Sequence, residues 1–147
     1  MTWEYVAGFF DGEGTIAHNG KGFRIAITQT NESVLREIQK LSGVGYILML
    51  KKRKSHWKDS WIFYIARQED VYKFIFGIKN YLIVKKQLAE QTAIKLKIYL
   101  KIEGKRKSLK EKRIRRARIL RTKGWSYRKI GKELNIDWGY IRRLLLK

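Results

Sequence analysis

The stretch that most constrains the fold lies near the N-terminus, at residues 5–16, with the sequence YVAGFFDGEGTI. Apolar residues recur there at helical spacing, and Thr2 is a helix-capping residue type placed just before them. This pattern predicts an amphipathic helix with an apolar stripe of Trp3, Val6 and Phe10. Another face has only small residues, at which a second backbone can approach closely: Ala7, Gly8 and Gly12.

The end of this helix is expected at its glycines. Gly12 and Gly14 are predicted to stop the helix, because glycine readily adopts the positive φ angles of a C-terminal cap. Glu13 is therefore expected at the helix end, with its carboxylate projecting beyond the packed face.

Residues 6–14, VAGFFDGEG, resemble the nine-residue signature of the LAGLIDADG homing endonucleases. In that family the last acid of the motif binds the divalent metal, and the matching residue here is Glu13. The alternative is a core helix whose glycine-rich end happens to include acids. A match over the whole motif, followed by a strand pattern, favours the family.

Composition indicates a nucleic-acid partner. The chain has 147 residues and a formal net charge of +21, and residues 101–147 contain 18 Lys and Arg against 4 Asp and Glu. Such a charge destabilises a compact monomer by self-repulsion, which a polyanion relieves. With 44% hydrophobic residues the chain can still bury a core, and without cysteine it has neither disulfides nor thiolate metal sites.

No signal peptide or long apolar span is present in the sequence. We therefore expect an intracellular protein, cytoplasmic or nucleoid-associated or in an organelle, that is not secreted and has no membrane partner. A small-molecule substrate is not expected either.

The spacing of apolar residues and turn signals predicts four strands and four helices in the first two-thirds of the chain. The expected order is helix 3–13, strands 15–18 and 23–28, helix 32–41, strands 46–54 and 60–66, and helices 69–81 and 84–102. Asn19–Gly22 forms the first turn, and Asn31 caps the helix that follows the second strand. This αββαββαα order is that of the LAGLIDADG core, an α+β fold with one saddle-shaped antiparallel sheet.

The resemblance implies that the outer face of this sheet lies in the DNA major groove. Arg24 alternates outward from the second strand, and the basic run 51–54 joins two strands on a cationic protein, where phosphate contacts are expected. The residues expected to bind DNA from this domain are Arg24, Thr28, Tyr46, Lys52, Lys54 and Tyr64.

The resemblance also implies an active site. Glu13 and the backbone carbonyl of Gly12 are the expected ligands of Mg²⁺ or Mn²⁺, whereas Asp11 is expected to have a structural role. Gln29, near the end of the second strand, and Lys85, before the last long helix, are the other expected catalytic residues. Lys86 replaces Lys85 if the register differs by one.

The chain contains one copy of the motif and therefore one acid. Two acids are needed to cut both DNA strands, so a homodimer is expected, with the two copies of Glu13 side by side. The expected dimer interface is Val6, Ala7, Gly8, Asp11 and Gly12.

The composition changes after residue 102, where we place a boundary between a LAGLIDADG domain, 1–102, and a second domain, 103–147. A basic linker, with nine Lys and Arg at 105–118, leads there into a helix-turn-helix pattern. Ser126 and Asp137 are the expected caps of its second and third helices, and Asn135 occupies a turn position that tolerates a left-handed conformation.

The third of these helices is expected to enter the major groove. Its candidate DNA contacts are Trp138, Tyr140, Arg142 and Arg143. The alternatives are a three-helix bundle that binds nothing and a dimerisation unit.

The sequence thus predicts a site-specific, metal-dependent double-strand DNA endonuclease, of the kind that spreads introns or inteins. It is expected to act as a homodimer on a long pseudo-palindromic site. Two alternatives remain open: a LAGLIDADG–helix-turn-helix regulator that binds DNA without cutting it, and an RNA maturase. Retention of Glu13 favours the nuclease.

Overall fold

The protein is described by a computed structural model that covers residues 1–52 and 54–146. The chain forms two compact units, Met1–Leu100 and Lys101–Lys147. One helix, α4 (Lys86–Thr122), contributes residues to both units.

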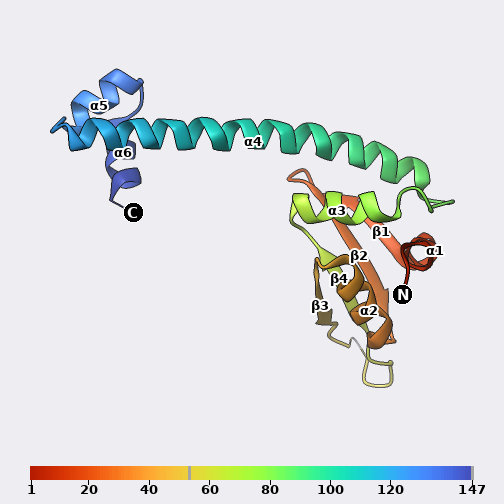
Figure 1. The fold of residues 1–147 in the computed structure, drawn as a ribbon. Helices are drawn as coiled ribbons and strands as arrows, with labels where there is room; N and C mark the ends of the chain where they lie inside the picture. The colour runs from red at the N-terminus through yellow and green to blue at the C-terminus, as the bar shows by residue number, and fades with distance from the viewer. Residues whose placement is uncertain (53, 147) are drawn as a thin grey trace. The chain divides into compact units, whose positions relative to one another are not determined.

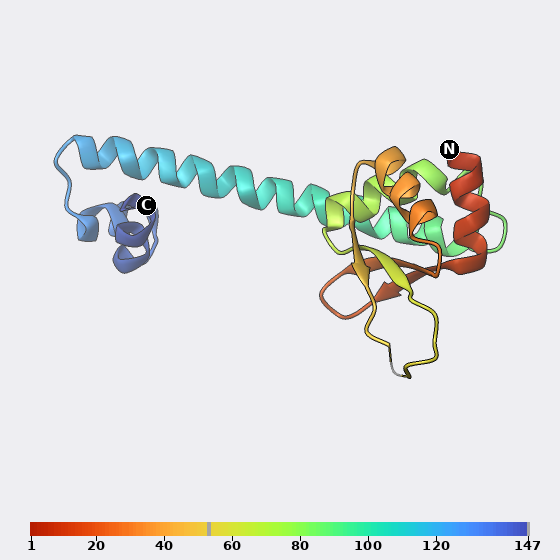
Figure 2. The ribbon, with the colours of Figure 1, turned by 90° about the horizontal axis from the view of Figure 1, so that it is seen from below.

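The first unit has the mixed α+β order that the sequence predicts. Its elements are α1 (Trp3–Glu13), β1 (Gly14–His18), β2 (Phe23–Gln29), α2 (Glu32–Ser42), β3 (Tyr46–Met49), β4 (Trp61–Ile65), α3 (Gln68–Ile78) and the start of α4. The strands form one antiparallel sheet in the order β1-β2-β4-β3. Helices α1, α2 and α3 lie on one side of this sheet, so its other face is left open (Figure 1, Figure 2).

Strand alternation separates the core from the open face. Ile25 and Ile27 of β2 and Phe63 of β4 are fully buried against the helices, whereas Arg24 and Thr28 are exposed. The helices complete the core with buried residues that include Val6, Ala7 and Phe10 of α1, Leu35 and Ile38 of α2, and Phe74 and Ile75 of α3.

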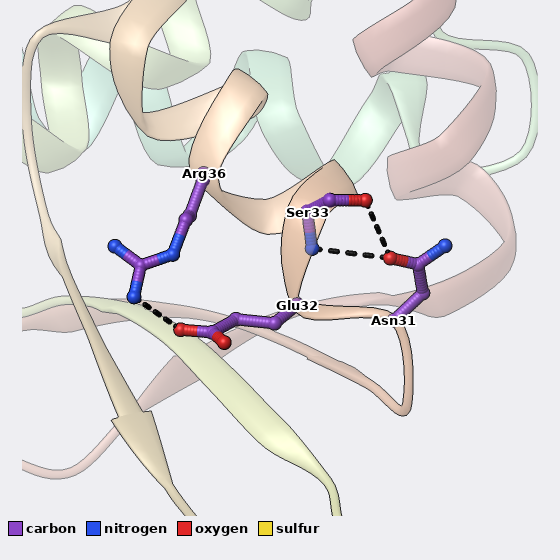
Figure 3. A network of polar contacts seen from close by, with 4 residues as sticks. All are labelled: Asn31, Glu32, Ser33 and Arg36. Carbon is purple, nitrogen blue, oxygen red and sulfur yellow. Dashed lines mark hydrogen bonds and ion pairs between the residues drawn. The ribbon is translucent and has the colours of Figure 1, made fainter.

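The start of α2 is held by a local polar network (Figure 3). The Asn31 Oδ1 accepts hydrogen bonds from the Ser33 amide, at 3.1 Å, and from the Ser33 hydroxyl, at 2.6 Å. Glu32 and Arg36 form an ion pair one helical turn apart. The predicted cap at Asn31 is therefore confirmed, and it fixes where the chain turns from β2 into the helix layer.

The glycines at the end of α1 do not act as predicted. Gly12 lies inside the helix, and Gly14, with φ −83° and ψ 152°, is extended because β1 begins there directly. Glycine is needed at position 14 for space, since a Cβ there would overlap the Phe10 ring.

Two predicted element ends are wrong, those of the third strand and of the helix that was expected to stop at residue 102. Strand β3 ends at Met49 rather than at residue 54, because ladder pairing stops near the bond from the Leu50 amide to the Ser60 carbonyl. No linker follows residue 102, because α4 is helical from Lys86 through Gly104 to Thr122. A glycine inside a helix costs only about 1 kcal/mol, and the neighbouring Glu103–Arg106 ion pair supports the same turn.

The second unit contains the rest of α4 with α5 (Tyr127–Leu134) and α6 (Trp138–Leu145). Its small core is made of Ala117, Ile130 and Ile141. The expected caps are present: Ser126 accepts from the Lys129 amide and Asp137 from the Tyr140 amide, and Asn135 is left-handed with φ 51°. Across the described residues, no helix is long and apolar enough to cross a membrane.

Candidate active site and nucleic-acid interface

Glu13 lies where α1 passes directly into β1, and it is exposed. Gly14, the next residue, pairs with Ile27, so Glu13 is at the end of the sheet where β2 finishes at Gln29. None of the ion pairs among the described residues engages the Glu13 carboxylate. The acid is thus placed at the surface with its oxygens available.

Asp11, two residues earlier, is held in a different way. Its carboxylate accepts hydrogen bonds from the amides of Ile83 at 2.6 Å, Val84 at 3.1 Å and Lys85 at 2.8 Å, just before α4 begins. Burial raises the pKa of Asp11, but these three amides and the Lys85 ammonium together hold that pKa below its ordinary value. Asp11 therefore has the structural role that the sequence suggested.

The Lys85 side chain in turn forms hydrogen bonds to the end of α1. Its Nζ donates to the carbonyl of Phe10 at 3.2 Å and to the carbonyl of Asp11, both in the last turn of α1. Two of the three ammonium donors are thereby used, which leaves one free. The predicted catalytic lysine lies at the end of the helix that bears Glu13.

Gln29 is half-buried at the end of β2, opposite Trp61 of β4. Its side-chain Oε1 accepts hydrogen bonds from the Thr30 amide at 2.8 Å and the Thr30 hydroxyl at 3.3 Å. Thr30 thus occupies the side-chain oxygen of Gln29, and the side-chain NH₂ group can donate hydrogen bonds to a ligand.

The oxygen donors here fit a hard divalent cation. Each chain offers the Glu13 carboxylate and the carbonyl of Gly12, which is next along from the carbonyls that Lys85 contacts. Within residues 1–52 and 54–146, no three His, Cys, Asp or Glu side chains gather as a metal site. The Glu13 carboxylate and the Gly12 carbonyl are thus the oxygen donors at this junction that suit such a cation.

The exposed face of α1 is narrower than the sequence suggests. Val6 and Ala7 are completely buried in the core of their own unit, so they have no surface left for a partner and their assignment to the dimer interface is corrected. Gly8 and Gly12 are open, because a Cβ added at either position would meet no atom within 4 Å. Tyr5, one turn before, is 52% exposed on the same helix.

Two exposed apolar residues whose amides contact the end of α1 were missed in the sequence. Ile83 is 87% exposed and Val84 77% exposed, and their amides bind Asp11 at the end of α1. The sequence signal that could have identified them is a pair of adjacent apolar residues between two helices, which belong to the apolar stripe of neither helix.

The open face of the sheet brings together several predicted DNA contacts. Tyr46 of β3 pairs with Tyr64 of β4, with ring centroids 5.5 Å apart, and Tyr64 pairs with Ala26, between Arg24 and Thr28. This face is largely aromatic, aliphatic and uncharged, and also includes Thr15, Leu48 and Ile62. Arg24 is its single cation among the paired strand residues.

The cations expected after β3 lie in the loop to β4. Lys52 forms an ion pair with Asp59 at 2.9 Å, which joins the two sides of the loop. Lys54 is exposed, and its carbonyl accepts from the Trp57 amide at 3.2 Å. Lys54 is therefore a freer candidate for phosphate contact than Lys52.

In the second unit, helix α6 buries Ile141 and exposes the four predicted contact residues, Trp138, Tyr140, Arg142 and Arg143. The structure adds cations that the sequence analysis did not single out. Arg128 lies over the Trp138 ring at 5.6 Å, Lys129 over Trp125 at 4.0 Å and Arg121 over Tyr127 at 4.5 Å.

These features define an α+β domain with helices on one face of an antiparallel sheet and an exposed acid at the first helix–strand junction. Residues 3–79 match the family model of the LAGLIDADG-like domain, and the chain belongs to that family. None of the curated proteins matches its sequence.

Solved structures share the fold. The meganuclease I-AabMI bound to uncleaved DNA is 21% identical, with a TM-score of 0.57, over 70% of this chain and 39% of that one. I-CpaMI bound to uncleaved DNA is 26% identical, with a TM-score of 0.50 and the same coverage. The homing endonuclease I-CvuI, in complex with the I-CreI target in the presence of Mg, is 19% identical, with a TM-score of 0.50.

The chain thus spans 39% of the length of I-AabMI and I-CpaMI and 65% of I-CvuI.

Proposed function

We propose that the protein is a site-specific, double-strand DNA endonuclease that hydrolyses phosphodiester bonds with a divalent metal. The observation that supports this most directly is Glu13, an exposed acid at the end of the family's motif helix. The high positive charge and the DNA-bound states of I-AabMI and I-CpaMI agree with a DNA substrate. The proposed place of action is intracellular DNA.

The chemistry follows from the donors at this junction. Glu13 and the Gly12 carbonyl would hold Mg²⁺ or Mn²⁺, and the bound ion would supply an activated water and offset charge on the phosphate. The Lys85 ammonium lies at the same helix end, and its third donor stabilises a phosphate oxygen or an ordered water. The Gln29 amide orients water from the end of β2.

A homodimer completes the site. One chain supplies one acid, whereas two strands must be cut, so two copies pair through the open face of α1. Gly8 and Gly12 let the partner backbone approach, and the exposed Ile83 and Val84 extend the apolar contact. Two copies of Glu13 placed together repel each other unless cations lie between them, which couples metal binding to the assembled dimer.

DNA lies along the open sheet face in this proposal. Tyr46, Tyr64, Arg24 and Thr28 meet base edges in the major groove, and Lys54 contacts phosphate from the β3–β4 loop. The second unit adds phosphate and base contacts from α6 as a helix-turn-helix, with Arg142 and Arg143 as its exposed cations.

The direct test is Glu13→Gln, which removes the charge and nearly keeps the shape. Cleavage of a duplex chosen from a randomised library is expected to disappear, while the dissociation constant for that duplex stays within about twofold, because affinity comes mainly from cations. Glu37→Gln, an exposed acid on α2, is the matched control and should cut normally. Wild-type cutting by the Glu13 variant would reject the metal role.

A second function has support from one observation, the cationic second unit with its paired helices α5 and α6. A regulator that binds DNA without cutting would use the same surfaces. Wild-type protein that binds a selected duplex and leaves it intact with Mg²⁺ and with Mn²⁺ would favour this function over the nuclease.

A further inference from the structure

Asp11 and Lys85 make two sets of contacts that run in opposite directions between the same two helices. The Asp11 carboxylate receives the amides of residues 83–85, which precede the first turn of α4. The Lys85 ammonium donates hydrogen bonds to the carbonyls of Phe10 and Asp11, in the last turn of α1. We propose that this Asp11–Lys85 clamp is the positioning device of the active site: it fixes the end of α1, and with it Glu13.

Each half of the clamp supplies a charged partner to backbone groups at a helix end. The first amides of a helix and its last carbonyls have no partner within the helix, and they are stabilised by an anion and a cation respectively. Asp11 supplies the anion at the start of α4 and Lys85 the cation at the end of α1. Because Asp11 belongs to α1 and Lys85 directly precedes α4, a movement of either helix end breaks both sets of bonds.

The clamp also lies close to Glu13 along the chain. Glu13 follows Asp11 by two residues, and Gly14 is already paired in the sheet with Ile27. The segment that bears the acid is therefore held on both sides, by the clamp before it and by the β1–β2 ladder after it. A catalytic ligand needs such support, because small displacements of a metal-binding group cost much of its activity.

The position of the clamp gives it a second consequence. The amides that bind Asp11 belong to Ile83, Val84 and Lys85, and the first two have exposed side chains. The clamp thus holds together the acid, the lysine and the apolar surface proposed for the partner copy. This consequence for catalysis rests on the proposed function, whereas the clamp itself is a property of the free chain.

The test compares Asp11→Asn with the matched control Glu90→Gln, which removes one exposed charge from α4. In free protein, hydrogen exchange followed by NMR should speed up at the amides of residues 83–85 by about tenfold in the Asp11 variant, since an amide group cannot accept all three bonds. The core amides of β2 and the control should be unchanged. Unchanged exchange at residues 83–85 would overturn the clamp, whatever the protein's activity.

Two further measurements test whether the clamp positions Glu13. On a duplex selected for binding, Asp11→Asn should lower the single-turnover cleavage rate by at least about tenfold while the DNA dissociation constant stays within about twofold. The same complex should bind Mn²⁺ more weakly, as measured by electron paramagnetic resonance, which needs no cleavage. A normal rate and normal Mn²⁺ affinity in the variant would overturn the positioning role.

A double-mutant cycle separates a clamp from general destabilisation. Lys85→Gln removes the ammonium, and its effect on exchange and Mn²⁺ affinity should overlap with that of Asp11→Asn, so the double variant is little worse than the worse single one. Two independent defects would instead multiply, which contradicts a shared device. If the wild-type protein cuts no duplex, the proposed function fails, and exchange and Mn²⁺ binding still decide the clamp.

Discussion

Single residues at the α1–β1 junction set the geometry of this protein. Gly14 and Asp11 are three residues apart, yet one is needed for space and the other for charge. Replacing Gly14 with alanine would press a methyl group into the Phe10 ring. We expect Gly14→Ala to lower the free energy of unfolding by about 1–3 kcal/mol, measured by urea denaturation. Gly12→Ala, at an open position, should cost far less, and equal losses would contradict the packing explanation.

Asp11 also makes stability depend on pH. Its pKa in the folded state lies below its ordinary value, so it stabilises the fold at pH values above that ordinary value. This contribution is lost as the pH falls through the folded-state pKa. Asp11→Asn should therefore be less stable than wild type at pH 7, with a difference that shrinks below about pH 4. Thermal unfolding from pH 3 to 7 checks this, and a difference that stayed constant would argue against it.

At the scale of elements, the open face of α1 is the contact that matters most for assembly. Gly8→Leu places a large side chain where the partner backbone is expected, so light scattering should show a shift from dimer to monomer and double-strand cutting should be lost. Gly104→Leu is the control, since Gly104 is also an open helical glycine. A wild-type protein that stays monomeric even on its DNA would reject the dimer.

At the scale of the whole molecule, charge is distributed unevenly: residues 101–147 hold 18 of the 34 Lys and Arg. If Arg142 and Arg143 contact phosphate, replacing both with glutamine should reduce the slope of log K against log salt by about 3.6 for the proposed dimer, at about 0.9 for each of the four contacts. If they read bases, preference at the outer positions of the site should relax as well. Lys40→Gln on α2 should change neither quantity, and a double variant that behaves like it would remove α6 from the interface.

The sequence by itself determined the order of elements in the first unit, the caps at Asn31, Ser126 and Asp137, and the family motif. These depend on residues within a turn or two of each other, where apolar period and capping chemistry act locally. The tertiary structure alone decided the rest. The packed core is needed for the burial of Val6 and Ala7 and for the contact between Gly14 and Phe10. It is also needed for the bonds from Asp11 to the amides of residues 83–85, which lie 72 to 74 positions later in the chain. Long-range contacts leave no periodic mark in a sequence, because each depends on how whole elements pack rather than on its neighbours in the chain.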